Sequence, residues 1–509
     1  MSSFPQRWTS TVSHWQATNR GASSLWNHGR EDPLPREVVD YVIVGGGITG
    51  TSLAYQLTRP GAAGHGKRVV LLEAKDVASG ATGRNGGHIA PASWTSFPTL
   101  VSPLEEGGAG LTAEDALHVL ANEADTLQLA EEIITAENLD VDFWKGFKLE
   151  GGLAWSSGQT SVEGRQADTI WDAVQTTPEG VEKSRRAHEA YVAAMRASKA
   201  YRDRVLEWQL VGDTEEAKKI SRMSSALALN KGPAGSCHPH RLATALARLA
   251  LASSTSQFSL FSWTPVKSFA EHDGVWDVDC GDRGSVRARD VILCSNGNTR
   301  TLFPDDWERG VGIAAHVTPF RGHASLVVPP PSYSGETGTL RHTYAVEQGP
   351  YLMFTPHSGI VLGVYNATAL SQGLGTKADI FDVVDDSVVL PKFREWLEGY
   401  CPKAFDGWGE EARGEGPVRT WSGIMGSSRD HLPLVGPVPG KPGLWAAVGF
   451  HGHGMARILT CTRSLATQIH NQGSWDERLP RCFAITEERL HCTRTMAPQL
   501  VAAQERPTG

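Results

Sequence analysis

Apolar and polar positions near the start of the chain follow two different periods. Residues 40–44 and 67–73 are short apolar runs, and residues 49–57 between them place apolar side chains at helical spacing. Glycines fill the turn between the first run and the helix. This order of strand, turn, helix and strand predicts a βαβ unit.

Farther along, the chain alternates between helix-like and strand-like segments. Helical spacing predicts helices over residues 111–137, 240–251 and 453–470, and a solvated helical hairpin over the charged stretch 179–220. Short apolar or alternating runs predict strands over residues 264–266, 275–278, 290–294, 312–328, 351–364 and 445–450.

Segments of βαβ type at both ends of the core enclose antiparallel strands. This predicts a mixed fold, α/β plus α+β, with a discontinuous Rossmann-type nucleotide-binding domain and an antiparallel-sheet substrate domain. We expect the first domain to comprise residues 36–95, 230–312 and 418–475, and the second, partly helical domain to comprise residues 96–229 and 313–417. Residues 1–35 would be a lead-in segment and 476–509 a C-terminal extension. In the lead-in segment Trp8, Trp15 and Trp26 are expected to pack onto the domain.

Composition removes several classes of function. The net charge of −8 gives no electrostatic footprint for nucleic acid, and no apolar run is long enough for a transmembrane helix. The seven cysteines are widely spaced and form no CxxC, which argues against a disulfide framework and against a metal site. We therefore expect a reducing, cytoplasmic location. The acid-free first 30 residues leave a mitochondrial transit peptide as the alternative.

The glycine turn has the spacing of a dinucleotide site. Gly45, Gly47 and Gly50 form G-x-G-x-x-G between the first strand and the helix. The first glycine allows the tight turn, the second lets the backbone approach a pyrophosphate, and the third lets the helix pack on the strand. Together with Ile48 and Thr49, the start of the helix would offer free N–H groups to the phosphates.

Two further features narrow the nucleotide. Glu73, at the end of the second strand, would accept hydrogen bonds from the ribose hydroxyls and repel a 2′-phosphate, which disfavours NADP and leaves NAD and FAD. Residues 78–88 form a second small, glycine-rich loop that can approach a long extended ligand. There Arg84, or the hydroxyls of Ser79 and Thr82, would reach phosphates. An NAD site has no obvious need for this loop, so FAD is favoured.

Five stretches occur in a fixed order along the chain. They are residues 83–87 (Gly-Arg-Asn-Gly-Gly), 236–242 (Ser-Cys-His-Pro-His-Arg-Leu), 319–323 (Pro-Phe-Arg-Gly-His), 421–436 (Trp-Ser-Gly through Asp-His-Leu-Pro-Leu-Val-Gly) and 449–455 (Gly-Phe-His-Gly-His-Gly-Met). Together they resemble the D-amino-acid oxidase (glycine/sarcosine oxidase) superfamily of FAD enzymes over residues 36–475. The first stretch most resembles the γ-glutamylputrescine oxidase branch.

The resemblance implies the parts of an FAD site. Residues 452–455 would start the closing helix beside flavin N1 and the C2 carbonyl, where a helix N-terminus stabilises negative charge. Val266 would meet the adenine, and the end of the 291–296 strand would close the pocket. The residues expected to contact FAD are Gly45, Gly47, Ile48, Thr49, Gly50, Glu73, Ala74, Ser79, Thr82, Arg84, Asn85, Gly86, Gly87, His88, Val266, Ser295, Gly297, Gly423, Gly452, His453, Gly454 and Met455.

Four residues are candidates for substrate chemistry. His88 would lie near the isoalloxazine ring and face the substrate or attach covalently to the flavin, with a histidine satisfied by backbone hydrogen bonds as the alternative. His453, between two glycines at the expected helix start, would be structural or orient the flavin, or act in catalysis. Arg321 would anchor a substrate carboxylate or form a structural ion pair. Tyr351 lies on a strand expected to cover the flavin face. Its neighbours Arg341, His342 and Tyr344 share that expectation, with ordinary strand packing as the alternative.

Two departures from relatives qualify the resemblance. Some members carry a flavin-bonded cysteine in the region that corresponds to residues 421–428, which has none here, so we expect non-covalent FAD. Some members carry an oxygen-activating lysine where this chain has Val361.

The sequence therefore predicts an FAD-dependent oxidoreductase that oxidises a C–N bond of an amine or amino acid by hydride transfer to flavin N5, with O2 as acceptor and H2O2 as product. The alternative is a dehydrogenase or biosynthetic tailoring enzyme with another acceptor or substrate. The loop at 80–87 and the segment at 449–455 argue against an NAD enzyme and against a protein that only binds flavin.

Overall fold

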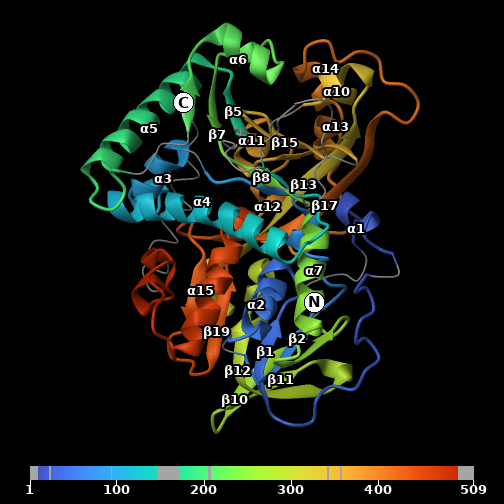
Figure 1. The fold of residues 1–509 in the computed structure, drawn as a ribbon, viewed down its shortest axis with the longest axis vertical. Helices are drawn as coiled ribbons and strands as arrows, with labels where there is room; N and C mark the ends of the chain where they lie inside the picture. The colour runs from blue at the N-terminus through green and yellow to red at the C-terminus, as the bar shows by residue number, and fades with distance from the viewer. Residues whose placement is uncertain are drawn as a thin grey trace.

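Two large sheets, one above the other in Figure 1, organise the protein. The computed structural model describes residues 10–490 except 22–23, 63, 93, 146–170, 204–207, 341–342 and 356–357. Trp8, Arg341 and His342 therefore lie outside the described residues.

The first sheet carries the predicted βαβ unit. Its order is β10-β11-β12-β1-β2-β9, with β19 paired to β12 and β18 to β19. The strands are β1 (Val39–Val44), β2 (Arg68–Leu72), β9 (Gln257–Phe261), β10 (Ser268–His272), β11 (Val275–Asp279), β12 (Ser285–Leu293), β18 (Leu434–Pro437) and β19 (Leu444–Val448). Strands β9, β2, β1, β12 and β19 run parallel. They are continuous apolar runs because a parallel sheet is buried on both faces.

Three helices pack side by side on this sheet: α2 (Ile48–Thr58), α7 (Pro239–Leu251) and α15 (Ile458–His470). Every residue of α2 is buried, since α7 and α15 flank it. The helix that follows the glycine turn is therefore held rigidly against β1.

The second sheet has the order β17-β13-β16-β15-β14-β5-β7-β6. Its strands are β5 (Trp171–Gln175), β6 (Gln209–Val211), β7 (Ala228–Gly232), β13 (Val317–Val328), β14 (Thr343–Val346), β15 (Pro350–Thr355), β16 (Gly359–Val364) and β17 (Gly416–Ser428). A small sheet of β3 (His88–Ile89), β8 (Gly235–Ser236) and β4 (Trp144–Lys145) lies between loops of the two halves.

Further helices surround the second sheet and its boundary with the first. The long helix α4 (Ala113–Ala136) crosses that boundary in Figure 1 and contacts α15. The others are α1 (His14–Ala17), α3 (Phe97–Val101), α5 (Pro178–Ala197), α6 (Thr214–Ser221), α8 (Pro304–Glu308), α9 (Gly312–His316), α10 (Gly335–Gly338), α11 (Asn366–Ser371), α12 (Lys377–Ile380), α13 (Pro391–Glu398) and α14 (Tyr400–Ala404).

The mixed fold class with a Rossmann-type sheet is confirmed, while several elements differ from prediction. Residues 264–266 are a connection between β9 and β10, after a left-handed turn at Trp263 (φ 55°). Residues 312–316 form α9 before β13 begins. The charged stretch is not a helical hairpin, because β6 joins the edge of the sheet between α5 and α6.

Two differences concern the expected nucleotide-binding domain. The closing helix α15 begins at Ile458, after a 3₁₀ turn at Gly454–Ala456, and not at His453. Strand β17 pairs with β13 in the second sheet, although residues from 418 onward were expected with the first. A side chain on β17 can therefore face a ligand held by the first sheet.

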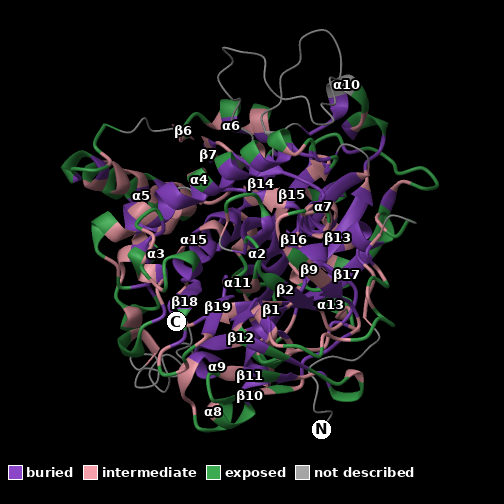
Figure 2. Ribbon diagram, turned by 60° about the horizontal axis from the view of Figure 1, so that its bottom comes forward, coloured by how far each residue is buried: buried purple, intermediate pink, exposed green. Residues whose placement is uncertain are grey.

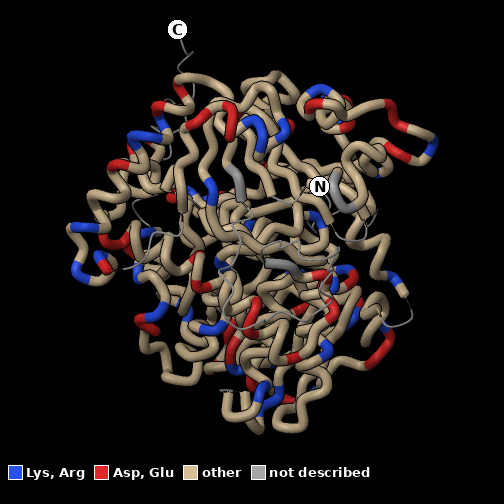
Figure 3. The backbone as a smooth tube through the Cα atoms, turned by 45° about the horizontal axis from the view of Figure 1, so that its top comes forward, with Lys and Arg blue, Asp and Glu red and all other residues tan. Residues whose placement is uncertain are grey.

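Burial and charge follow this arrangement. Buried residues fill the strands at the centre of Figure 2, while acidic and basic residues are interspersed around the molecule in Figure 3. Trp15 is buried and Trp26 packs edge-on against Trp263, as expected of the lead-in segment. Within the described residues, six cysteines are free thiols, and no helix is long and apolar enough to cross a membrane.

Candidate active site

A cavity of about 2240 Å³ lies between the two sheets. The first sheet contributes the ends of β1, β2 and β12, at Gly45, Glu73 and Ser295. The second contributes Tyr351 of β15 and Met425 of β17. One continuous space therefore joins the predicted nucleotide site to the antiparallel sheet.

The glycine turn at the bottom of this cavity requires its glycines. Gly45 has φ +113°, and a Cβ there would lie 2.7 Å from the carbonyl oxygen of Cys294. A Cβ on Gly50 would lie 1.9 Å from the carbonyl oxygen of Gly45, so only glycine lets α2 pack this close to the turn. The N–H of Ile48 donates to Thr82 Oγ1 at 2.8 Å, which ties the second loop to the start of the helix.

Glu73 is held with its carboxylate on the cavity wall. Its oxygens accept hydrogen bonds from the N–H of Gly46 (2.6 Å) and of Lys75 (2.9 Å). Burial raises the pKa of Glu73. A buried carboxylate in this position suits a neutral ligand group that donates hydrogen bonds, such as a sugar hydroxyl.

Most of the residues singled out in the sequence line the cavity. They are Gly45, Gly47, Ile48, Thr49, Glu73, Ala74, Ser79, Thr82, Asn85, Gly86, His88, Val266, Ser295, Gly297, Tyr351, Gly452, His453, Gly454 and Met455. Gly50, Arg84, Gly87, Arg321 and Gly423 are not among the lining residues. Gly87 and Gly423 allow close packing instead: a Cβ would lie 2.6 Å from Met353 Cε at the first and 2.8 Å from Arg84 Cβ at the second.

Arg84 is a structural residue, and its expected phosphate contact is wrong in this geometry. Its guanidinium donates to the carbonyl oxygens of Ser79 (2.7 Å) and Ser422 (2.7 Å) and to Thr11 Oγ1 (2.9 Å), and it lies 3.6 Å from the carboxylate of Asp386. The side chain thus joins the second glycine-rich loop to β17 and to the N-terminal segment, because its partners come from those elements.

Arg321 also has its donors occupied away from the cavity. Nε and Nη2 donate to the carbonyl oxygen of Asp385 at 3.0 and 2.9 Å, and Nη1 donates to that of Asp379 at 3.3 Å. These are main-chain acceptors, so the guanidinium neither anchors a substrate carboxylate here nor forms the expected ion pair. It fastens the 379–385 segment to β13.

His88 and Tyr351 form an uncharged wall of the cavity. The two rings meet edge-on with centroids 5.6 Å apart, and Tyr365 lies 5.2 Å beyond Tyr351. Burial lowers the pKa of His88 to about 4 and raises the pKa of Tyr351 to about 12. At neutral pH this wall therefore carries no charge.

His453 belongs to a buried ionic cluster. Its Nε2 lies 3.0 Å from Glu123 on α4, and Arg457 donates to the same carboxylate at 2.8 Å. The N–H of Ala92 donates to Glu123 at 2.6 Å. Burial alone would raise the pKa of Glu123, but the charges of His453 and Arg457 lower it to about 2. The cluster orients His453 toward the cavity that it lines.

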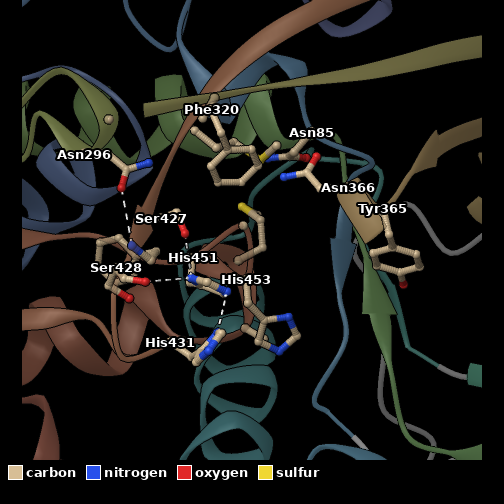
Figure 4. Close-up of a pocket in the computed structure, with 18 of the residues that line it drawn as sticks. Asn85, Asn296, Phe320, Tyr365, Asn366, Ser427, Ser428, His431, His451 and His453 are labelled. Atoms are coloured by element: carbon tan, nitrogen blue, oxygen red, sulfur yellow. Dashed lines mark hydrogen bonds between the residues drawn. The ribbon is translucent and has the colours of Figure 1, made fainter. Parts of the chain in front are cut away.

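For Asn296 the sequence predicts only that the end of the 291–296 strand closes the pocket, and for Ser427, His431 and His451 it predicts no role. Asn296 has φ 44° and accepts hydrogen bonds from the N–H groups of Gly449 (3.1 Å) and Phe450 (3.3 Å), which sets the position of the closing segment. Ser427, His431 and His451 form a hydrogen-bonded chain on the same wall (Figure 4). The signal in the sequence is that His431 and His451 lie within the stretches 421–436 and 449–455, at positions where the family motifs allow any residue.

Two other residues, Val361 and Asp430, have structural positions. Val361 is fully buried in a cluster with Trp15 and Trp421 and does not line the cavity. Asp430, which follows the cavity residues of β17, is paired with Arg489 of the C-terminal extension and lies 3.2 Å from His316 Nε2. Asp430 therefore holds the segment around Arg489 against the turn before β18.

The residues present fit FAD. A Cβ on Gly45 or Gly50 would collide with the main chain of the turn, the half-buried carboxylate of Glu73 lies on the wall, and the same cavity extends to the uncharged wall at His88 and Tyr351. Gly45, Gly47 and Thr49 would hold the phosphates, and Glu73 the ribose.

Comparison with known proteins agrees with this fit. A family model described as FAD dependent oxidoreductase matches residues 40–467. The tRNA 5-methylaminomethyl-2-thiouridine biosynthesis bifunctional protein MnmC of Acidovorax sp. (strain JS42) is 35% identical over 60 residues, which is 11% of this chain and 9% of that protein. The match thus spans only a small part of that relative.

Solved structures resemble nearly the whole chain. Glycine oxidase from Geobacillus kaustophilus superposes with a TM-score of 0.62 at 19% identity, covering 88% of this chain and 98% of that one. L-amino acid deaminase from Proteus vulgaris, with its specific insertion sequence deleted, gives a TM-score of 0.61 at 16% identity, covering 92% and 98%. At these identities the likeness establishes the fold.

Proposed function

Because the chain belongs to the FAD-dependent oxidoreductase family, we propose that it oxidises a C–N bond of an amine or amino acid and passes the electrons to O2, giving H2O2. The observation that carries this proposal is the single cavity that joins the dinucleotide site to an uncharged aromatic wall at His88 and Tyr351. When bound, FAD supplies the chemistry by accepting a hydride from the carbon next to nitrogen.

The uncharged wall favours the neutral form of an amine. His88 is neutral because burial lowers its pKa to about 4, and Tyr351 stays protonated because burial raises its pKa to about 12. An ammonium ion placed against such a wall would lose hydration without gaining a counter-charge. The substrate nitrogen would therefore lose its proton before it binds against this wall.

The named relatives support the same class of substrate. Glycine oxidase and L-amino acid deaminase share this fold, and both names denote reactions at an amino acid. The resemblance of residues 83–87 to the γ-glutamylputrescine oxidase branch adds polyamine-derived amines to the candidates.

We further propose that FAD is held without a covalent bond. Residues 421–428, whose counterpart carries a flavin-bonded cysteine in some relatives, contain no cysteine here. Acid precipitation of the purified protein should release all of the flavin into the supernatant. Flavin that stays with the precipitate would contradict this.

Val361 keeps a second candidate open, an enzyme that uses an acceptor other than O2. The side chain is apolar and buried away from the cavity, so it supplies no cation for oxygen activation. In that case the same substrates would reduce the enzyme, but reoxidation in air would be slow.

One experiment tests the proposal and separates the candidates. The purified holoenzyme is mixed anaerobically with a panel of amines, amino acids and polyamine derivatives, and bleaching of the flavin absorbance is followed. Air is then admitted and peroxide is measured. Bleaching followed by one peroxide per substrate supports the oxidase, bleaching without peroxide supports the second candidate, and no bleaching by any compound refutes both.

A further inference from the structure

Two histidines connect a serine on the cavity wall to the protein surface. Ser427 Oγ lies 3.0 Å from His451 Nδ1, His451 Nε2 lies 2.8 Å from His431 Nδ1, and His431 Nε2 lies 2.8 Å from the carbonyl oxygen of Gly107. Figure 4 shows His451 between the two serines at one end and His431 at the other. Ser427, His451, His431 and Gly107 all line the cavity, and of these four Gly107 is the exposed one.

The carbonyl at the outer end sets the direction of these hydrogen bonds. A carbonyl oxygen only accepts, so His431 Nε2 must carry a hydrogen. In neutral His431 the other nitrogen, Nδ1, is then an acceptor, and His451 Nε2 must donate to it. His451 Nδ1 is left with a lone pair, which accepts the hydroxyl hydrogen of Ser427. The neutral chain is therefore ready to take up a proton from the cavity side.

The same atoms also accommodate one additional proton. His451 Nδ1 lies 3.2 Å from the carbonyl oxygen of Ser428 as well as near the Ser427 hydroxyl. If Nδ1 gains a hydrogen it can donate to that carbonyl, while Nε2 loses its hydrogen to His431 Nδ1. His431 then carries the positive charge and still donates to Gly107. The additional proton therefore gives the carbonyl oxygen of Ser428 a hydrogen bond from His451 that it lacks in the neutral chain.

Both histidines occupy a backbone conformation that histidine seldom adopts. His431 has φ 63° and His451 has φ 52°. Such residues cost free energy and are concentrated at functional sites. Their main chains are fixed, since His451 N–H donates to Gly426 O (2.8 Å) and Arg457 donates to His431 O (3.0 Å).

The charged groups around the pair are themselves neutralised. Arg457 is paired with Glu123, which also faces His453, and Asp430 is paired with Arg489. Burial, followed by His431 and Arg457, lowers the pKa of His451 to about 3. The inner ring therefore passes a proton on to the outer ring, which is half-buried and donates to the exposed Gly107.

We propose that Ser427, His451 and His431 form a proton outlet that removes the ammonium proton of the incoming substrate, an assignment that rests on the proposed amine oxidation. The substrate N–H proton goes to Ser427 Oγ, the Ser427 hydroxyl proton goes to His451 Nδ1, and the His451 Nε2 proton goes to His431 Nδ1. His431 releases one proton to water, and no electrons move in the outlet. The product of this step is the neutral amine that the uncharged wall favours.

The positive φ of His451 indicates which substitutions its backbone will tolerate. Glycine and asparagine both accept a positive φ, so His451→Gly and His451→Asn should fold. His451→Asn keeps hydrogen-bonding groups beside Ser427 but cannot relay a proton. His451→Gly leaves room for added imidazole. Gln472→Gly is the matched control, because Gln472 has φ 53°, is exposed and lies outside the cavity lining.

The test follows the rate of anaerobic flavin reduction by an amine that reduces the unmodified enzyme. Both His451 variants should be slower by about 10²-fold or more below the pKa of the amine and should approach the unmodified rate above it. Imidazole should restore the rate of His451→Gly, whereas 1-methylimidazole, which has no second N–H to pass on, should not. Gln472→Gly should react normally. A normal rate in His451→Asn, or equal rescue by both imidazoles, would overturn the outlet.

A second measurement needs no substrate. In NMR spectra of the holoenzyme labelled with ¹⁵N-histidine, the ring signals of His451 and His431 are identified by their loss in His451→Gly and in His431→Gly. Both sets of signals should show the Nε2–H tautomer. An Nδ1–H tautomer at either ring would overturn the direction of the chain. If no amine reduces the unmodified enzyme, the proposed function and the assigned proton donor both fail. If an amine reduces it and the variants react normally, only the outlet fails.

Discussion

Glu123 is the residue on which the closing segment depends most. It is fully buried, and it binds His453 and Arg457 from the C-terminal part of the chain and Ala92 from the N-terminal part. Without the carboxylate, the buried guanidinium of Arg457 would lack its counter-charge. Breaking a buried ion pair from one side costs about 3–5 kcal/mol.

We therefore expect Glu123→Gln to lower the free energy of unfolding by about 3–5 kcal/mol, measured by urea denaturation. Glu132→Gln, on the exposed face of the same helix, is the control and should change it by less than about 0.5 kcal/mol. Equal stabilities of the two variants would show that the cluster does not stabilise the fold.

The pH dependence of the same residue has a definite sign. The pKa of Glu123 is lowered from 4.5 to about 2. Its contribution is therefore complete above pH 4.5 and is lost as the pH falls from there to about 2. In Glu123→Gln this part of the acid destabilisation should be absent, so the stability curves of the two proteins should converge at low pH. Parallel curves would contradict the shift.

Gly50 tests the packing of the nucleotide turn. A Cβ there would meet the carbonyl oxygen of Gly45 at 1.9 Å, which backbone atoms can relieve only by moving α2. We expect Gly50→Ala to cost about 1–3 kcal/mol and to weaken FAD retention on gel filtration. Gly212→Ala is the control, since nothing lies within 4 Å of the added methyl group. Full retention of FAD in Gly50→Ala would argue against this turn as the phosphate site.

At the scale of elements, residues 10–20 form an N-terminal strap across the second glycine-rich loop. Trp15 Nε1 donates to Asn85 O at 2.7 Å, and Ser13 Oγ donates to Gly83 O. On the other side Thr11 donates to Ser422 O on β17 at 3.1 Å. The strap therefore holds the loop between the two sheets.

Removing Trp15, which anchors the strap, should loosen the second glycine-rich loop. Trp15→Ala leaves a cavity in a buried site, at a cost of about 3–5 kcal/mol. We expect weaker FAD binding, measured by fluorescence titration, and faster proteolysis within residues 79–88. Trp26→Ala is the control, because Trp26 packs on Trp263 and not on the loop. The same FAD affinity in both variants would contradict the role of the strap.

An element could be predicted from the sequence where the interactions that form it join residues close together in the chain. The β1–α2–β2 unit was predictable because its glycines and apolar spacing act over few residues. The start of α15 was placed too early because the left-handed Gly452 (φ 73°) and the 3₁₀ turn after it interrupt the helical pattern. One partner of Arg84, Ser422 on β17, lies 338 positions away along the chain, so its structural role could not be predicted from its neighbours in sequence.

The candidate site shows the same limit. Gly45, Gly47 and Glu73 line the cavity as the sequence predicts, since their chemistry is tied to the turn itself. His431 and His451 lie within the C-terminal motifs, but the sequence predicts no role for them. Their proposed role depends on the carbonyl of Gly107, which belongs to a different loop.

At the scale of the whole molecule, each sheet is assembled from distant parts of the chain. The first sheet needs β1, β12 and β19, and β17 of the second sheet lies between the last two in sequence. The long cavity between the sheets is lined by both. Such interleaving favours unfolding of the two halves as one unit.

We expect one calorimetric transition that shifts as a whole when FAD is added. At a free FAD concentration 100 times its Kd, binding should stabilise the fold by about 2.7 kcal/mol and raise Tm accordingly. Two transitions, only one of which responds to FAD, would show that the halves unfold separately.

The strap also bears on how the protein is made. Thr11 and its partner Ser422 are 411 positions apart, so residues of the strap must wait for residues that are synthesised much later before they can pack. Until then the loop at 79–88 lacks one of its two supports, and β19 is missing from the first sheet. Until β17 and β19 have been made, the nascent chain therefore has no finished nucleotide pocket, and we expect tight flavin binding only after that point.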